Sequence, residues 1–369
     1  MDNLPPELLR RILLHLITER TWIFEIHERV PKTSLFAYAA ISRKWQSVVE
    51  PFTFRYMYLN PMRLDVAKAY NYFTLPRLAH LRYVHFDIEF PAHDLHVSTN
   101  PEDYDDQKVE WWLCDGEKMN TELRIRQRTE FAYTLKLLPK SIETFRLEYI
   151  RKSPTDMTFQ PQSIVPPDAT CDILSRELRR FSQRDGLKEF LVDASVDSSI
   201  LWPDFQDPGS ESPTWPNLSW FHVELNDVLP SGEWLDIRDP EDEEDEFHGN
   251  FDWDDAPYSE VPGDEYEKRF RCISSPIHFE RFALATARAA SKMPKIRELY
   301  LTHHGDAGMA VGFVTRALEK SCCLEFSKEP LPQPSEETMD AWRKVVKLHG
   351  LEWNVHFAYG ADAYYFYTL

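Results

Sequence analysis

The sequence predicts an α/β protein in which a small helical module is followed by a larger, irregular solenoid of strands and helices. Three observations lead to this fold class. Apolar side chains in the first fifty residues recur at helical spacing, a short apolar pattern then appears five times, and segments with helical periodicity separate its copies. The domains expected from this pattern are residues 1–56 for the helical module and 57–369 for the solenoid.

The first helix is expected to begin at Pro5 and Pro6, which a first helical turn tolerates. Glu7 suits the same turn because a carboxylate complements the positive end of the helix dipole. Apolar residues then recur three or four positions apart, with arginines between them. These apolar residues are Leu4, Leu8, Leu9, Ile12, Leu13 and Leu16.

Two more short helices complete the predicted module. Residues 19–33 contain Trp22 and several other apolar residues, and they are expected to form a helix that ends before Pro31. Ser34 is a suitable N-cap for a third helix, which Pro51 is expected to end. The apolar stripe of this third helix contains Leu35, Tyr38, Ala39, Ile41, Trp45, Val48 and Val49.

The recurring pattern of the larger domain reads Pro-x-Leu-x-x-Leu-x-Leu with conservative replacements. Three copies keep the proline ("PRLAHLRY", "PNLSWFHV" and "PKIRELYL"), and two lack it ("IETFRL" and "LKEFLV"). The last two apolar positions of each copy alternate along a strand and therefore point inward. Helices are expected between the copies, over 120–138, 169–183, 276–292, 311–320 and 335–349, so the alternation favours parallel strands with crossover helices.

Such a pattern is typical of leucine-rich-repeat-like solenoids, whose units bury their apolar faces by stacking on their neighbours. Copies are 31 to 78 residues apart here, whereas regular leucine-rich repeats have a period of roughly 20–29 residues. Either the units carry large insertions or the domain is an irregular α/β fold. Residues 203–214 and 236–268 are expected to be loops.

The second of these loops is an acidic insertion. It holds fifteen Asp or Glu residues and one arginine between Asp236 and Glu267, and so supplies most of the net charge of −19. We expect it to be disordered and solvated, and the alternative is an arm that binds a basic partner.

Composition excludes several classes of function. The negative net charge opposes binding to the phosphates of nucleic acids. No apolar run is long enough to span a membrane. Five scattered cysteines without a CxxC pair favour a reducing compartment, the cytoplasm or the nucleus. The sequence also has no Gly-rich phosphate loop, HExxH or GxSxG, so we expect no enzyme, no cofactor and no metal.

Two features are candidates for chemistry. His303 and His304, with Asp306, follow a predicted strand and are the best candidates for a metal or acid–base site. A loop role is preferred, because neighbouring residues at a strand end point to opposite faces. Cys322 and Cys323, at the end of the predicted helix over 311–320, are expected to be structural thiols.

Three further features have a structural interpretation, and two of them also have a binding interpretation. Trp111 and Trp112 belong either to the core or to a partner contact. Glu336 and Glu337 are expected in the first turn of a helix, where they complement its dipole. A group of four arginines is either solvated helix surface or a phosphate site, and its members are Arg176, Arg179, Arg180 and Arg184.

The N-terminal pattern resembles the F-box, a small helical module that docks onto the Skp-type adaptor of a cullin–RING ubiquitin ligase. The resemblance covers about residues 3–50. Its residues are Leu4-Pro5-Pro6-Glu7-Leu8, Ile12-Leu13 and Leu16, then Leu35, Ala39, Ser42-Arg43 and Trp45 in a second block. The two blocks lie about a dozen residues further apart than is usual in the family. Downstream, "EPFTFRYMYL" and the strand–helix units resemble fungal F-box proteins with degenerate repeats in their general pattern rather than in a specific motif.

The resemblance implies a non-catalytic substrate receptor of an SCF-type ubiquitin ligase, with an unidentified target protein bound by the larger domain. Such a receptor raises the local concentration of target lysines near the ubiquitin carrier. The implied adaptor contacts are Leu4, Pro5, Leu8, Ile12, Leu16 and Trp45. The alternative is an interaction scaffold whose F-box-like module is packed on its own body. Solvent exposure of Leu4, Leu8 and Ile12 distinguishes the two.

Overall fold

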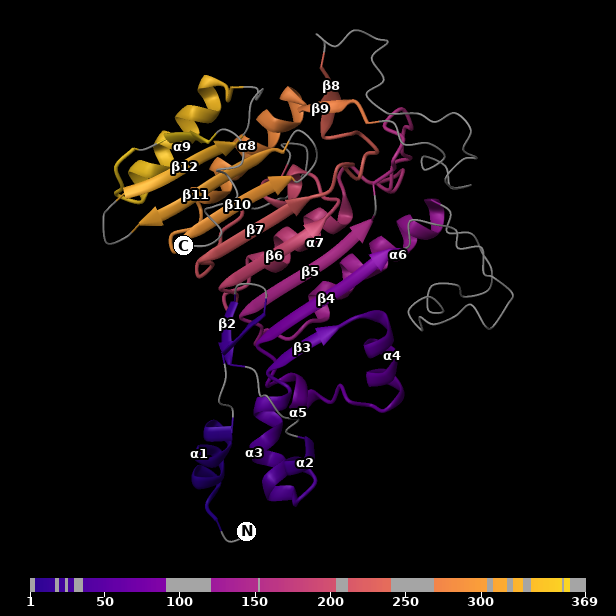
Figure 1. Cartoon of the computed structure of the whole chain (residues 1–369), viewed down its shortest axis with the longest axis vertical. Helices are drawn as coiled ribbons and strands as arrows, with labels where there is room; N and C mark the ends of the chain where they lie inside the picture. The colour runs from indigo at the N-terminus through magenta and orange to yellow at the C-terminus, as the bar shows by residue number, and fades with distance from the viewer. Residues whose placement is uncertain are drawn as a thin grey trace. The chain divides into compact units, whose positions relative to one another are not determined.

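The structure is a computed structural model that describes residues 4–16, 20–23, 26–29, 36–90, 121–151, 153–203, 212–239, 269–303, 308–316, 321–327, 333–353 and 355–358. It is a mixed α/β protein with a large, mostly parallel sheet (Figure 1), which confirms the predicted α/β class. The chain divides into two compact units. The first is Met1–His85 with Pro139–Thr144, and the second is Phe86–Leu138 with Phe145–Leu369.

The first unit contains the N-terminal helices and the beginning of the large sheet. Ser42 caps the third of these helices, since its hydroxyl accepts a hydrogen bond of 3.3 Å from the backbone N–H of Trp45. In chain order the elements are α1 (Pro6–Leu16), β1 (Arg20–Ile23), β2 (Ile26–Arg29), α2 (Phe36–Ala39), α3 (Arg43–Thr53), β3 (Tyr56–Leu59), α4 (Pro61–Ala69), α5 (Leu75–Leu78) and the start of β4 (Tyr83–Phe90).

The helix predicted over residues 19–33 is wrong. The described residues of this segment form an antiparallel hairpin, in which β1 and β2 pair from Arg20 with Arg29 to Ile23 with Ile26. The segment "RTWI" is rich in β-branched and aromatic residues, which favour extended backbone. Two smaller corrections concern the same unit. The single helix expected between Ser34 and Pro51 is divided into α2 and α3, with Ser42 rather than Ser34 as the N-cap of α3. Helix α3 also continues through Pro51 to Thr53.

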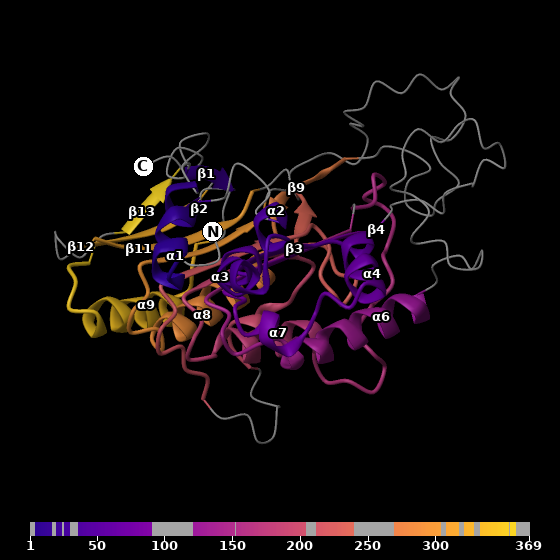
Figure 2. The same cartoon turned by 90° about the horizontal axis from the view of Figure 1, so that it is seen from below.

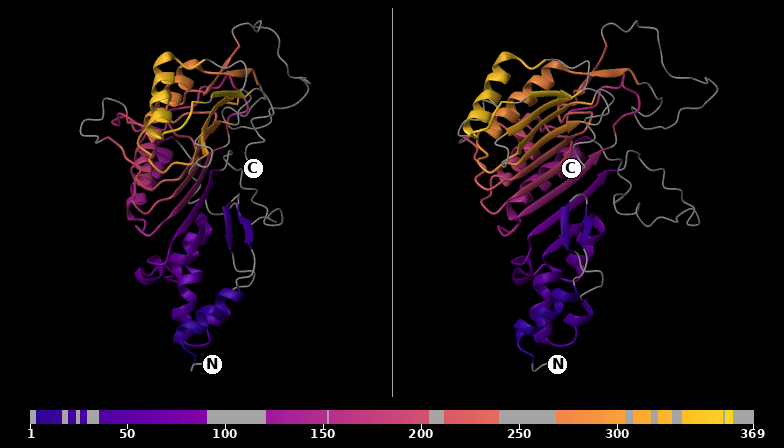
Figure 3. Two further views of the ribbon diagram at one scale, coloured as in Figure 1. Left: turned by 90° about the vertical axis from the view of Figure 1, so that its left-hand side faces the viewer. Right: turned by 60° about the vertical axis from the view of Figure 1, so that its left-hand side comes forward.

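The second unit contains most of the sheet. Its strand order is β13-β12-β11-β10-β7-β6-β5-β4. The helices α6, α7, α8 and α9 lie along one face of this sheet (Figure 2), and a side view shows the same arrangement for the orange and yellow helices (Figure 3).

The elements of the second unit follow β4 in this order: α6 (Thr121–Thr134), the 3-10 turn Leu135–Leu137, β5 (Thr144–Arg151), α7 (Ile173–Ser182), β6 (Glu189–Ala194), the 3-10 turn Ser198–Ile200, β7 (Trp220–Leu225), β8 (Asp236–Arg238), β9 (Arg271–Ser274), α8 (Pro276–Ala290), β10 (Glu298–His303), β11 (Ala310–Arg316), β12 (Ser321–Ser327), α9 (Glu336–Leu348) and β13 (Val355–Ala358). The predicted helices over 120–138, 169–183, 276–292 and 335–349 are confirmed as α6, α7, α8 and α9.

The strand pattern read from the sequence aligns across the sheet. β6 and β10 both pair in parallel with β7, and Phe190, Phe221 and Leu299 lie opposite one another in the register. The last two pattern positions of every copy are buried, from Leu81 and Tyr83 to Leu299 and Leu301. The pattern residues from Phe145 onward belong to the second unit. The core of that unit therefore lies between its strands and the helices that cover one face of the sheet.

The helix predicted over residues 311–320 is also wrong. β11 covers Ala310–Arg316 and pairs antiparallel with both β10 and β12, so Cys322 and Cys323 lie on a strand. Val311 and Phe313 are fully buried and lie two positions apart, which is the period of a strand. Within the predicted loop over 236–268, Asp236–Arg238 form β8 with a partner in β9. Residues 240–268 lie outside the described part of the chain, as do residues 204–211.

Candidate functional site

Helix α1 divides its apolar residues between two faces. Leu9 and Leu13 are fully buried against Trp45, Val48 and Val49 of α3, and together these five residues form the small core of the N-terminal helices. Leu4, Tyr38, Ala39 and Phe52 pack around that core. The two blocks of the F-box-like pattern therefore meet in one cluster of side chains.

The other apolar face of α1 is exposed. Leu8 is 43% exposed and Ile12 is 41% exposed. Residues four positions apart lie one above the other on a helix, so these two side chains form one strip, and Pro5, also exposed, precedes it. We call Pro5, Leu8 and Ile12 the α1 ridge. Leu14 is 47% exposed, but it lies neither three nor four positions from Leu8 or Ile12, so it is on a different face of α1 and is not part of the ridge.

The six residues implied as adaptor contacts have different environments. Three form the α1 ridge. Leu4 is half-buried against the core, and the side chain of Leu16 lies outside the described residues. Trp45 is 3% exposed and stacks on Tyr38 with 6.0 Å between ring centroids, so its role is to hold the helices together.

Sequence periodicity did not identify every exposed apolar residue near this core. Ile41 belongs to the predicted apolar stripe of the third helix, yet it is 49% exposed. It lies in the turn before the N-cap Ser42, where the backbone is not helical. The signal that could have found it is the N-cap itself, because helical periodicity starts only after the cap.

His303 occupies a buried polar position rather than an open site. It is the last residue of β10 and is 2% exposed. Its Nε2 lies 2.8 Å from Asp227 Oδ1, and its Nδ1 lies 3.7 Å from Asp236 Oδ1. Burial acts to raise the pKa of Asp227, but the hydrogen bonds and charge of its partners, His303 first, lower that pKa below its ordinary value. His304 and Asp306 lie outside the described residues, and among those described no group of His, Cys, Asp and Glu is arranged to hold a metal ion.

The four arginines around α7 are engaged in structural contacts. Arg176 and Arg180 form ion pairs with Glu177 at 3.2 Å and 2.6 Å. Arg179 is buried and donates a 2.6 Å hydrogen bond to the carbonyl of Ser199. Arg184 donates to the carbonyls of Leu135 and Leu138 at 2.9 Å each and lies over the ring of Phe181. These contacts leave no common pocket for a phosphate among the four.

The remaining candidates have simple outcomes. Cys322 is buried, and its Sγ donates to the carbonyl of Glu352 at 3.3 Å. Glu336 and Glu337 lie in the first turn of α9, as predicted. Trp111 and Trp112 lie outside the described residues.

The fold and the site together describe a mixed α/β protein whose N-terminal helix carries an exposed apolar ridge. Comparison of the chain with models of known protein families, with characterised proteins and with solved structures gives no match in any of the three. Of the helices in the described ranges, none combines the length and the apolar composition that a membrane crossing requires.

Proposed function

We propose that this protein is a substrate-recognition subunit of an SCF-type, cullin–RING ubiquitin ligase. The α1 ridge contacts the Skp-type adaptor, and the second unit, as a leucine-rich-repeat-like solenoid, binds a target protein. The protein performs no covalent chemistry itself, and it works in the cytoplasm or the nucleus. The observation that supports the proposal is the division of α1, in which Leu9 and Leu13 are fully buried while Leu8 and Ile12 remain exposed.

The energetics of the ridge favour a partner. Burying a large aliphatic side chain contributes about 1.5–3 kcal/mol relative to leaving it exposed. A single exposed leucine is ordinary on a protein surface. Leu8 and Ile12, however, are aligned on one face of a helix whose sequence resembles an adaptor-binding motif. Two such aligned apolar side chains are the anchor pattern of helix-in-groove recognition. The free energy gained on binding therefore comes from Leu8 and Ile12, and not from Leu9 and Leu13, which are already buried.

The first test replaces the two large aliphatic side chains of the α1 ridge in one double variant, Leu8→Ala with Ile12→Ala. We expect the affinity for the Skp-type adaptor to fall by about tenfold or more, because both apolar contacts are lost. The thermal melt should stay close to that of the wild type, since neither side chain belongs to the core. Co-expression with the adaptor, pull-down and calorimetry measure the two effects.

Leu14→Ala is the matched control. It removes an equally exposed leucine from the same helix but leaves the ridge intact, so adaptor binding should persist. Adaptor binding that survives the double substitution contradicts the proposed contact. A wild-type chain that never co-purifies with the adaptor favours an interaction scaffold instead.

A further inference from the structure

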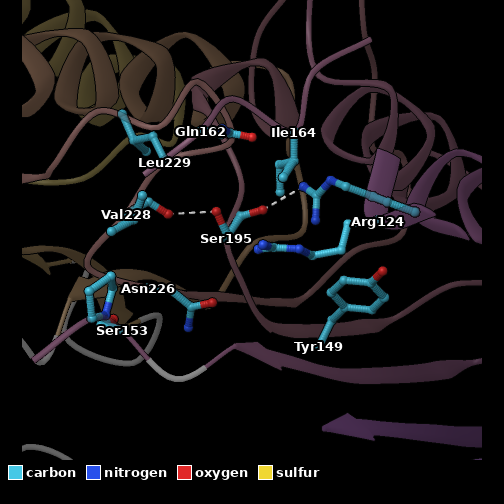
Figure 4. Close-up of a pocket in the computed structure, with 11 residues that line it drawn as sticks. Arg124, Tyr149, Ser153, Gln162, Ile164, Ser195, Asn226, Val228 and Leu229 are labelled. Atoms are coloured by element: carbon cyan, nitrogen blue, oxygen red, sulfur yellow. Dashed lines mark hydrogen bonds between the residues drawn. The ribbon is translucent and has the colours of Figure 1, made fainter. Parts of the chain in front are cut away.

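A small pocket with polar and charged side chains in its lining lies where β5, β6 and β7 end (Figure 4). Arg124 and Arg128 reach it from α6, and Tyr149 reaches it from β5. Ser195 and Asn226 directly follow β6 and β7. Strands β6 and β7 are parallel, and the carboxyl ends of parallel strands are where α/β proteins place their ligands.

Arg128 is the central charge of this pocket. It is 3% exposed, and its Nε and Nη2 donate to the two carboxylate oxygens of Asp172 at 3.0 Å and 2.8 Å. Nη2 also donates to the carbonyl of Ser195 at 2.5 Å. Burial acts to lower the pKa of Arg128, but Asp172 outweighs burial and raises that pKa above its ordinary value. The guanidinium is therefore charged at every relevant pH.

One end of this guanidinium lacks a partner. Within the described residues, Arg128 Nη1 is buried and makes no hydrogen bond. A buried charged donor without an acceptor carries the penalty of its lost hydration, and native proteins satisfy nearly all such groups. An acceptor in the pocket would remove this deficit.

A second buried polar atom in the pocket is an acceptor that lacks a donor. Asn226 donates from Nδ2 to Asp193 at 3.2 Å, while its buried Oδ1 has no donor among the described residues. The hydroxyl of Ser195 is already used, since it donates to the carbonyl of Val228 at 2.5 Å. Burial raises the pKa of Tyr149 to about 12, so this phenol is neutral. The pocket thus lacks one acceptor and one donor, and its charged lining consists of two arginines.

The size of the pocket limits its occupant. About 40 Å³ is open to the centre of a water-sized sphere. One water needs about 10–15 Å³ by this measure, so the space suits roughly three waters or one small organic anion. Drug-sized ligands need cavities of roughly 300–1,000 Å³.

We propose that this pocket binds a small 2-hydroxycarboxylate. The carboxylate accepts hydrogen bonds from Arg128 Nη1 and from Arg124, because its two oxygens can accept from two guanidinium groups, whereas a halide is a single acceptor. The hydroxyl donates to Asn226 Oδ1. Glycolate is the smallest anion that carries both groups, and acetate is the matched anion without the hydroxyl.

The experiment uses the full chain and titrates glycolate against it at constant ionic strength. We expect glycolate to raise the melting temperature, whereas chloride has no such effect, and acetate to bind more weakly because Asn226 Oδ1 then stays unpaired. Arg124→Gln should reduce the glycolate affinity about tenfold or more in calorimetry. The control is Arg126→Gln, which removes an exposed arginine from the same helix outside the pocket.

Arg128 is unsuitable for this test, because its loss would leave Asp172 buried and unpaired. Asn226→Ala is the second variant, and it should abolish the preference for glycolate over acetate. Equal stabilisation by chloride, no glycolate binding to the wild type, or unchanged affinity in Arg124→Gln would overturn the proposal. Stronger binding of inorganic phosphate than of glycolate would also overturn it.

Discussion

At the scale of single residues, Asp172 shows how one buried carboxylate can connect distant segments. It is the N-cap of α7, and its Oδ2 accepts hydrogen bonds from the backbone N–H and the hydroxyl of Ser175 at 2.8 Å and 2.5 Å. It also pairs with Arg128 of α6, 44 residues away. Burial acts to raise the pKa of Asp172, but Arg128 and Ser175 lower it below its ordinary value. The ion pair is thus a fixed part of the second unit.

Asp193 behaves in the opposite way and gives a prediction for pH. Burial first, and then the charges of Glu224 and Glu148, raise the pKa of Asp193 to about 7. The folded chain therefore keeps a proton that the unfolded chain releases near pH 4. Stability falls as the pH rises from about 4 to about 7, because the unfolded state ionises first in that window.

Asp193→Asn removes this dependence and keeps an oxygen for Asn226. We expect the variant to gain about 1–3 kcal/mol over the wild type between pH 5 and pH 8, measured by urea unfolding at both values. Asp168→Asn, at an exposed aspartate, is the control and should show no such gain. A difference between variant and wild type that does not grow with pH would contradict the predicted role of Asp193.

At the scale of elements, the turn around Gly232 depends on glycine. Its φ is +87°, and a Cβ at this position would lie 2.2 Å from the carbonyl oxygen of Pro161. The carbonyl of Gly232 also accepts a 2.6 Å hydrogen bond from Gln160 Nε2. Backbone from another segment therefore occupies the space where a side chain would be.

Gly232→Ala combines an unfavourable φ with a clash against backbone, so we expect a loss of about 3 kcal/mol or more in the free energy of unfolding. The comparison is Gly350→Ala after α9. Gly350 also has a positive φ, +65°, but no atom lies within 4 Å of its Cβ position. That variant should lose only about 1 kcal/mol. Equal losses in denaturant unfolding would show that the clash is relieved by a shift of the Pro161 backbone.

The sequence predicts elements best where a specific cap or a repeated spacing marks them. Ser335 caps α9 and Gly350, with a positive φ, follows it, in agreement with the helix predicted over 335–349. The five apolar patterns precede or enter strands. The hairpin β1–β2 and the strand β11 were predicted as helices, because a short apolar run satisfies both periods. Their pairing partners decide the outcome, and pairing is not visible in the run itself.

The candidate site follows the same logic. The sequence identifies α1 as an apolar helix, but Leu8 and Leu9 are chemically identical, and only the rotation of α1 against α3 separates an exposed residue from a buried one. The pocket was not predicted at all. Its key contact joins Arg128 to the carbonyl of Ser195 across 67 positions of the chain, and no local motif marks such a contact.

At the scale of the whole molecule, one backbone arrangement repeats at the start of successive strands. The N–H groups of Ser219 and Trp220 both donate to the carbonyl of Lys188, and those of Arg297 and Glu298 both donate to the carbonyl of Ser219. Glu143 and Thr144 likewise share the carbonyl of Arg82. The register of each strand is thus fixed at its first residues, so segments of very different length can lie between the strands.

The side chains behind this register form a continuous core in the second unit. Phe190 is fully buried, and its ring lies 5.6 Å from that of Phe145 and 5.2 Å from that of Phe221. It is the middle of three stacked rings on adjacent strands. Removing it leaves a cavity that both neighbours line, and close-packed interiors relax only partly around such a cavity.

Phe190→Ala should therefore lower the free energy of unfolding by about 3–5 kcal/mol, and Phe190→Leu should lose less because it fills part of the space. Leu137→Ala, at a residue that is 75% exposed, should stay near the wild type in urea unfolding.

The α1 ridge consists of first-unit residues alone, so adaptor affinity should be unchanged in Phe190→Ala at temperatures well below its transition. Loss of adaptor binding in a folded Phe190→Ala protein would mean that the adaptor contact extends beyond the N-terminal helices.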